Sequence, residues 1–376
     1  MGTPGRLRLS AISHSSLQTF VTFRPCLEFL GAALRKKKIG WNILLVLLSA
    51  FLAVILAARA ANALRAGIDA LPPDIQTLYN TGQYRQAAEA LQAEVERNPK
   101  DAGLYFWLGR CFFELRDFSR SISSFESAVA LDPGRSEYHD WLGKACGRKA
   151  DESSHSNMGL AVSMARRTHH EFETAVQLDA TNVNAQRDLV EFLASAPPGD
   201  LGGGEKHALD QIRALSAVDS LEGALALADL YAVRKKFDQA GEEYQKILDS
   251  SPNRIDAYLE AAEYYRDRGN AEHMEQAVEA ASKVDASDRR LSYYRGVALV
   301  LQQKDPAVAE KDLRIYIDTV ADNSELPAHS SAYKWLGKLY ENEGKPDLAA
   351  EQFKAGLALD PQNKPLREAL KKLQKR

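Results

Sequence analysis

The sequence predicts an all-α protein, a solenoid of stacked helical hairpins that follows an N-terminal transmembrane helix. Three observations lead to this prediction. The 376 residues include only 23 Gly and 14 Pro, whereas strong helix formers such as Ala, Leu, Glu and Lys are abundant. A small residue recurs at intervals of 34 residues or somewhat more along most of the chain. A stretch of twenty uncharged, mostly apolar residues lies near the start.

The apolar stretch, residues 39–58, is long enough to be a membrane span. Twenty helical residues cover a hydrocarbon core of about 30 Å. Residues 1–38 carry seven Lys or Arg and one acid, and an excess of positive charge marks the cytoplasmic side. We therefore expect a basic cytoplasmic segment (1–38), a transmembrane helix or uncleaved signal anchor (39–58) and a linker (59–70). The rest of the chain would lie across the membrane.

Two alternatives for this N-terminal region stay open. The tripeptides Ala58-Arg59-Ala60 and Ala61-Asn62-Ala63 fit the cleavage pattern of a signal peptide, although a basic leader of 38 residues is long for one. Residues 1–38 are also Arg-rich and poor in acids, as in a mitochondrial presequence.

The recurring position defines the repeat. It is occupied, in chain order, by Gly109, Gly143, Val190, Ala228, Ala262, Gly296 and Gly337, with spacings of 34, 47, 38, 34, 34 and 41. A 34-residue period is typical of stacked helix–turn–helix units. We predict about eight repeats over residues 71–362. Residues 363–376 are expected to form a cap helix, because the last repeat would otherwise expose its apolar face.

The repeat pattern resembles the tetratricopeptide repeat (TPR) family over roughly residues 70–362. The segment LGKLYENEGKPDLAAEQFKAGLALDP, residues 336–361, is close to an ideal copy, whereas the copies around Val190 and Gly296 depart most from the pattern. The resemblance implies a concave surface, lined by the first helix of each pair, that binds protein partners. With its expected anchor, the chain also resembles membrane-anchored bacterial TPR proteins. It is therefore expected at the bacterial inner membrane as a single-pass protein, with its array on the periplasmic side.

Three spacings exceed 34 and indicate insertions near 147–160, 196–204 and 318–328. In the first insertion, a helix over Met158–Gln177 is longer than a normal second helix. Its extension is expected to project beyond the stack or to fold back over a groove. The second insertion is interpreted as a lengthened turn within one repeat. The third is interpreted as a loop or linker between pairs.

Several stretches resemble motifs that carry chemistry but lack a residue or a spacing that the chemistry needs. The glycines at 202–204 resemble a phosphate-binding loop, but Glu205 stands where the motif needs Lys. Adjacent residues on a helix point in different directions, so His169 and His170 are not expected to share a metal ion. No CxxC or GxSxG motif occurs, and the net charge of −3 does not indicate nucleic-acid binding. We expect no catalytic residue, metal or cofactor.

The two cysteines of the repeat region, Cys111 and Cys146, are interpreted as small core residues. A disulfide between them is the alternative. It would require an oxidising compartment and a suitable distance between the two Cα atoms.

The resemblance also gives partner-binding positions, carried over copy by copy onto the first helices. The predicted residues are Phe106, Arg110, Phe113, Glu114, Asp140, Lys144, Arg148 and Arg187. Aromatic residues and Arg are the usual hot spots of interfaces. An extended protein segment with an acidic side chain or a C-terminal carboxylate is the expected ligand.

The predicted function is that of a non-enzymatic scaffold or adaptor, anchored in the membrane and active in cell-envelope assembly or secretion. Two alternatives stay open. The chain could be a self-assembling structural scaffold. It could instead be an enzyme or small-molecule binder that uses the helix at 158–170 as a lid.

Overall fold

The computed structural model describes residues 71–373, which form seventeen α-helices and, within that range, no β-strand. The predicted segments 1–38, 39–58 and 59–70 lie outside the described residues, as do the last three positions of the predicted cap. Across residues 71–373, none of the helices combines the length and the apolar character needed to cross a membrane. The predicted all-α helical solenoid is confirmed for this part of the chain.

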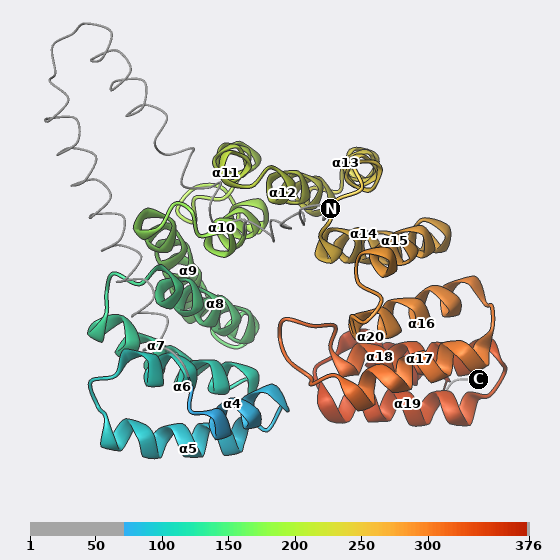
Figure 1. Ribbon diagram of the computed structural model, residues 1–376, viewed down its shortest axis with the longest axis horizontal. Helices are drawn as coiled ribbons and strands as arrows, with labels where there is room; N and C mark the ends of the chain where they lie inside the picture. Colours follow the sequence, from blue (N-terminus) through green and yellow to red (C-terminus); the bar gives the residue numbers. More distant parts are fainter. Residues whose placement is uncertain (1–70, 374–376) are drawn as a thin grey trace, which may run out of the picture. The chain divides into compact units, whose positions relative to one another are not determined.

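The helices follow one another as eight hairpins and a final single helix (Figure 1). The pairs are α4 (Pro73–Asn80) and α5 (Tyr84–Arg97), α6 (Ala102–Glu114) and α7 (Phe118–Leu131), α8 (Ser136–Ser153) and α9 (Met158–Leu178), α10 (Val183–Ser195) and α11 (Glu205–Val218), α12 (Ser220–Val233) and α13 (Phe237–Asp249), α14 (Ile255–Asp267) and α15 (Ala271–Val284), α16 (Arg290–Gln302) and α17 (Pro306–Thr319), and α18 (His329–Asn342) and α19 (Pro346–Leu359); α20 (Lys364–Leu373) ends the series.

The recurring small residue lies where the two helices of a hairpin touch. A Cβ atom added to Gly109 would lie 2.7 Å from the ring of Phe125, and one added to Gly337 would lie 2.2 Å from the ring of Phe353. Both distances are far shorter than a carbon–carbon contact, so these rings can pack only against glycine. The small residue therefore sets the close approach of the two helices.

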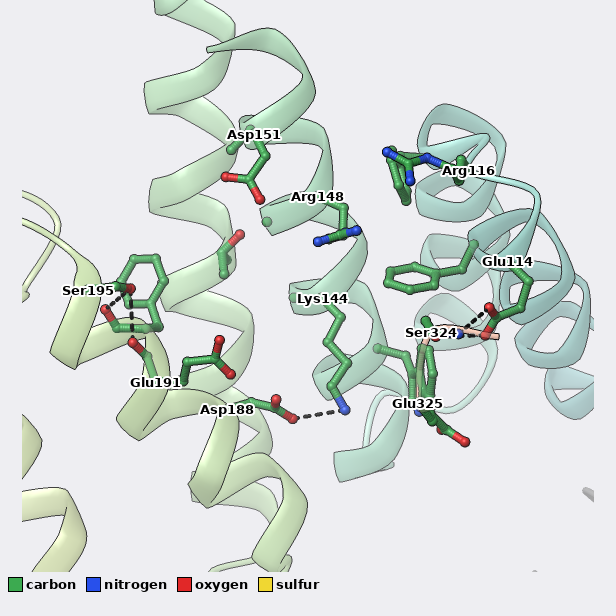
Figure 2. A pocket seen from close by; sticks show the side chains of 18 of the residues that line it. Glu114, Arg116, Lys144, Arg148, Asp151, Asp188, Glu191, Ser195, Ser324 and Glu325 are labelled. Carbon is green, nitrogen blue, oxygen red and sulfur yellow. Dashed lines mark hydrogen bonds and ion pairs between the residues drawn. The ribbon is translucent and has the colours of Figure 1, made fainter. Parts of the chain in front are cut away.

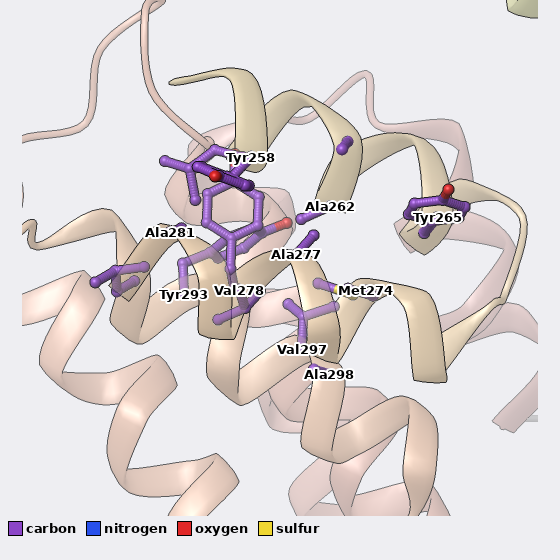
Figure 3. Packing of buried hydrophobic residues seen from close by; sticks show 14 of the residues in the cluster. Tyr258, Ala262, Tyr265, Met274, Ala277, Val278, Ala281, Tyr293, Val297 and Ala298 are labelled. Atoms are coloured by element: carbon purple, nitrogen blue, oxygen red, sulfur yellow. The ribbon is translucent and has the colours of Figure 1, made fainter. Parts of the chain in front are cut away.

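The apolar core runs along the array as a series of clusters. Figure 3 shows part of one cluster, in which Tyr258 of α14, Met274 of α15 and Tyr293 of α16 pack together. Met274 and Tyr293 are fully buried, although they belong to different hairpins. Each hairpin therefore completes its core only by stacking on its neighbours, as expected for a repeat protein.

The first helices of successive hairpins also contact one another. From α6 to α16, each first helix contacts the first helix of the next hairpin, and this series ends at α18. Helices that approach one another in this way lie on the inner side of a curved array. Side chains that point away from the stack on these helices therefore face the concave surface.

The first insertion lengthens both helices of the third hairpin. The helix expected over Met158–Gln177 is observed as α9, with 21 residues, and α8 has 18 residues. Because α8 is extended as well, the added turns of α9 pack against α8, and Ala161 in those turns is buried. The extension of α9 is therefore one half of a lengthened hairpin, and its turns pack on α8.

The other two insertions connect helices. Residues 196–204 join α10 to α11, and the amides of Gly203 and Gly204 donate to the carbonyl groups of Pro197 and Leu193. These two amides are thus already hydrogen-bonded within the turn. Residues 320–328 join α17 to α18 and extend toward the helices of the first repeats (Figure 1). We call residues 320–328 the closing loop.

Candidate partner-binding cleft

A cleft of about 900 Å³ lies on the inner face of the array. Its walls are formed by α6, α8, α9 and α10, and the closing loop forms the opposite side. Figure 2 shows Lys144, Arg148 and Asp151 in a row along α8, with Glu191 and Ser195 of α10 beside them. The cleft therefore combines segments that lie about two hundred residues apart in the sequence.

Arg110 of α6 is held in a cage of aromatic rings. Its guanidinium carbon lies 4.1 Å from the ring centre of Trp141. The rings of Trp107 and Tyr79 lie 5.1 and 5.3 Å away. Cation–π contacts of this kind hold a guanidinium in a fixed orientation. Its Nη2 donates a 2.8 Å hydrogen bond to a carboxylate oxygen of Glu325 in the closing loop.

Glu114, one helical turn after Arg110, also binds the closing loop. Its carboxylate accepts hydrogen bonds from the backbone N and the side-chain Oγ of Ser324, both at 2.8 Å. Burial raises the pKa of Glu114, and the two hydrogen bonds from Ser324 act in the opposite direction. Arg116 adds an ion pair of 3.8 Å to Asp360, which follows α19. The α6 side of the cleft is therefore tied to the last repeats.

Lys144 of α8 is already neutralised by two carboxylates. Its Nζ lies 2.9 Å from Asp140 and 2.9 Å from Asp188 of α10. The Asp140 side chain is 3% exposed, and burial together with the nearby Asp188 raises its pKa. Although burial opposes the charge of Lys144, Asp188 and Asp140 raise its pKa. This trio stabilises the contact between α8 and α10 and leaves Lys144 little capacity for a further anion.

Arg148 is the basic side chain of α8 that stays open to the cleft. It is exposed and lies 5.9 Å from the ring of Phe118. Within residues 71–373, no carboxylate lies within ion-pair distance of Arg148, and no cation lies within ion-pair distance of Glu191. Burial, with the nearby Asp188, raises the pKa of Glu191. Arg148 and Glu191 therefore offer two unpaired charges on adjacent helices.

Both predicted aromatic residues, Phe106 and Phe113, are not presented on an open face. Phe106 is 2% exposed and stacks on Tyr138, with 5.0 Å between ring centres. Phe113 is 7% exposed and meets the edge of Trp141 at 5.4 Å, although it still lines the cleft. The physical reason is that both rings face α8, and the stacking of the third hairpin covers them. The expectation that they project outward is corrected.

Arg187, also predicted for the same surface, lies further along the array. Its guanidinium makes three ion pairs, each of 3.0 Å, with Glu222, Asp229 and Glu260. It lines a second, smaller cavity of about 400 Å³ rather than the main cleft. Of the eight predicted residues, the main cleft thus brings together Phe113, Glu114, Lys144 and Arg148 on its walls, with Arg110 and Asp140 just behind them.

His169, Cys111 and Cys146, the residues considered for metal and thiol chemistry, pack against other side chains. The imidazole of His169 stacks on the ring of Phe192 at 5.3 Å, which gives it a packing role. Within residues 71–373, no three His, Cys, Asp or Glu side chains are arranged to hold a metal ion. Cys111 and Cys146 are buried free thiols, so the disulfide alternative is wrong. Burial raises the pKa of both thiols.

The sequence comparisons identify the repeat type. Residues 75–136 and 301–364 match the sequence profile described as tetratricopeptide repeat. Intraflagellar transport protein 70B of Bos taurus is 22% identical over 198 residues, which cover 52% of this chain and 28% of that protein. The human protein of the same name is 23% identical over 142 residues, which cover 37% and 21%. The chain spans less than a third of the length of these curated relatives.

Solved structures with similar helices include a tetratricopeptide repeat protein from Parabacteroides merdae. Its TM-score is 0.43 at 17% identity, and the match covers 77% of this chain and 99% of that one. A thermophilic TPR protein from Thermus thermophilus has a TM-score of 0.41 at 19% identity, with coverage of 50% and 94%. The two profile matches correspond to helices at the beginning and at the end of the described array. The chain therefore contains tetratricopeptide repeats in both places, as the sequence pattern predicted.

Proposed function

We propose that this chain, which carries tetratricopeptide repeats, is a non-enzymatic scaffold or adaptor that holds an extended segment of a protein partner in the main cleft. The single observation that carries the proposal is a pair of charges, Arg148 and Glu191, that have no ion-pair partner among residues 71–373 and lie on adjacent inner helices beside a cavity of about 900 Å³. Inner helices of a solenoid offer an extended concave surface that suits such a segment.

The charges of the cleft define the segment in more detail. Its lining contains seven carboxylates, against three basic side chains, of which Lys144 and Arg116 are already paired. A purely acidic segment would therefore meet repulsion along most of its length. We propose a segment of mixed charge, with a carboxylate at Arg148 and a Lys or Arg beside Glu191. The proposed segment therefore differs from the one expected from the sequence, because it carries a basic residue in addition to the carboxylate.

A photo-crosslinker at Ser195 tests the proposal. Ser195 is exposed and lines the cleft, whereas Glu351 is exposed on α19 outside it and provides the matched control position. We expect capture of one dominant partner from Ser195 and not from Glu351. Capture should be lost in the Arg148→Glu variant, whose melting temperature should stay unchanged because Arg148 is exposed. Equal capture from both positions, or capture that survives Arg148→Glu, would contradict the proposal.

The same experiment separates the alternative functions. Capture of a second copy of the chain alone would favour a self-assembling scaffold. The remaining alternative, an enzyme or small-molecule binder, would use the 158–170 helix as a lid; this range belongs to α9, which packs against α8.

We further propose that residues 39–58 anchor the chain in a bacterial inner membrane, with the repeats on the periplasmic side and a role in envelope assembly or secretion. The proposal is supported by the uncharged stretch and the basic residues before it. Extraction of membranes with alkaline carbonate should leave the full-length chain in the pellet and release a variant that lacks residues 39–58. Release of both proteins would contradict the anchor. Protease added to spheroplasts should digest the repeats, and protection of the repeats would contradict the orientation.

A further inference from the structure

The closing loop binds α6 as a peptide ligand would. Two consecutive residues, Ser324 and Glu325, are bound by two residues one helical turn apart, Glu114 and Arg110. The contacts include a backbone amide as well as a hydroxyl and a carboxylate. Extended segments are commonly recognised through this combination of main-chain and side-chain groups. The α6 residues therefore form a docking position for an extended chain, and the protein's own loop occupies it.

The docking position is built in advance of any ligand. The Arg110 side chain is 12% exposed and is fixed by three aromatic rings. Its Nε atom is buried and finds no hydrogen-bond partner among residues 71–373. A guanidinium held in this way loses little conformational entropy when it binds a carboxylate. Arg110 is thus prepared for an anionic group at the place where Glu325 now lies.

The acidic residue of the loop tip is held weakly, whereas the two ends of the loop are held firmly. The Glu325 side chain is 60% exposed, and exposed ion pairs contribute little to stability. At the ends, Tyr316 donates a hydrogen bond to the carbonyl of Pro327, and His329 binds the carbonyl of Val320 at 2.9 Å. The tip can therefore leave α6 while α17 and α18 stay folded.

We propose that Arg110 and Glu114 form a docking site for an extended partner segment with a hydroxyl residue followed by an acidic residue, and that Ser324 and Glu325 occupy this site in cis. The proposal rests on the proposed function, because it names the chemistry of one part of the partner segment. A partner must displace the loop tip before it can bind this site. The loop therefore lowers the apparent affinity of the site for the partner. The acidic residue of the segment would replace Glu325 at Arg110.

A peptide with the sequence of the loop, VADNSELPA, acetylated at the N-terminus and amidated at the C-terminus, is the probe. Fluorescence anisotropy would compare the full-length wild-type chain with the Ser324→Ala/Glu325→Gln loop variant. We expect the loop variant to bind the labelled peptide at least tenfold more tightly than the wild type, because its own tip competes less. Glu351→Gln, an exposed carboxylate outside the cleft, is the matched control and should behave as wild type.

A second set of variants tests the docking residues. Adding Glu114→Gln to the loop variant should abolish most of the gain, and Arg110→Gln should do the same if its melting temperature is retained. Equal binding by wild type and loop variant, a gain that survives Glu114→Gln, or no binding by the loop variant at millimolar peptide would each overturn the inference. These outcomes are separate from capture at Ser195. Successful capture with no peptide binding would reject only the docking site, and peptide binding without capture would reject the partner proposal.

Discussion

The carboxylate of Glu114 in α6 accepts two hydrogen bonds of 2.8 Å from Ser324, which lies 210 residues later in the chain. This contact joins the second hairpin to the loop before the last one. Because the same loop forms one wall of the main cleft, its position decides how open the cleft is to a partner.

The Glu114–Ser324 contact predicts slow hydrogen exchange at the loop tip. Glu114→Gln removes the negative charge that the Ser324 amide binds, and a charge-assisted hydrogen bond contributes enough for about a tenfold change in exchange rate. Exchange monitored by mass spectrometry on a fragment covering residues 320–328 should therefore speed up by about that factor. Glu351→Gln should leave the rate unchanged. An unchanged rate in Glu114→Gln would show that the loop tip is not held by α6.

The packing of hairpins predicts a sharp difference between two glycines. In Gly337→Ala, the new methyl group would lie 2.2 Å from the Phe353 ring, and overpacking of this kind costs about 1–3 kcal/mol. In Gly159→Ala, in the first turn of α9, the methyl group would meet nothing closer than 3.6 Å, and the lower backbone entropy of alanine in the unfolded chain favours the fold by at most about 0.5–1 kcal/mol. Urea denaturation should show loss of stability in the first variant only. Equal stabilities would contradict the close approach at Gly337.

Because Phe106 is buried, we expect its truncation to destabilise the fold and not merely to remove a contact with a partner. Truncation of a fully buried aromatic side chain costs about 3–5 kcal/mol, so Phe106→Ala should lower the melting temperature markedly. Arg148→Ala, at an exposed position of the cleft, should keep the melting temperature and reduce partner capture. Thermal unfolding followed by circular dichroism separates the two outcomes. A Phe106→Ala protein as stable as wild type would show that this ring is not part of the core.

The Asp140 carboxylate predicts a pH-dependent stability. Burial and the neighbouring Asp188 raise the pKa of Asp140 from 3.8 to about 7. Because the folded chain binds this proton more tightly than the unfolded chain, the contribution is fully present below about pH 4 and is lost as the pH rises through about 7. The slope for one proton is at most about 1.4 kcal/mol per pH unit. Asp140→Asn should flatten the dependence of the unfolding free energy over this window, and an unchanged slope would contradict it.

The repeat architecture could be predicted from the sequence because its cause is local. Gly109 and Gly337 stand at fixed distances from the aromatic rings they contact, so the period and the residue types are both visible in the chain. The sequence does not predict the lengthening of α8, because the residues inserted after Cys146 show a clear helical pattern only from Met158 onward. Its length of 18 residues has no motif of its own in the sequence.

The candidate site could be predicted only in part. Arg110, Glu114, Lys144 and Arg148 lie in or beside the cleft because helical spacing places them on the inner face. The burial of Phe106 depends on how α8 stacks on α6, and this stacking cannot be predicted from the local sequence pattern. The role of the closing loop depends on the curvature of the whole array. An excess of seven residues indicated a loop there, but not its contact with α6.

The most direct test of the central claim is the position of a captured segment in the cleft. Photo-crosslinkers at Ser195 of α10 and at Arg116 after α6 lie on different walls. If one extended segment fills the cleft, both should react with a single partner, at sites within about ten residues of each other, since an extended chain advances about 3.4 Å per residue. Crosslinks to unrelated proteins, or to sites scattered over the surface of one partner, would contradict the claim that the cleft holds an extended segment.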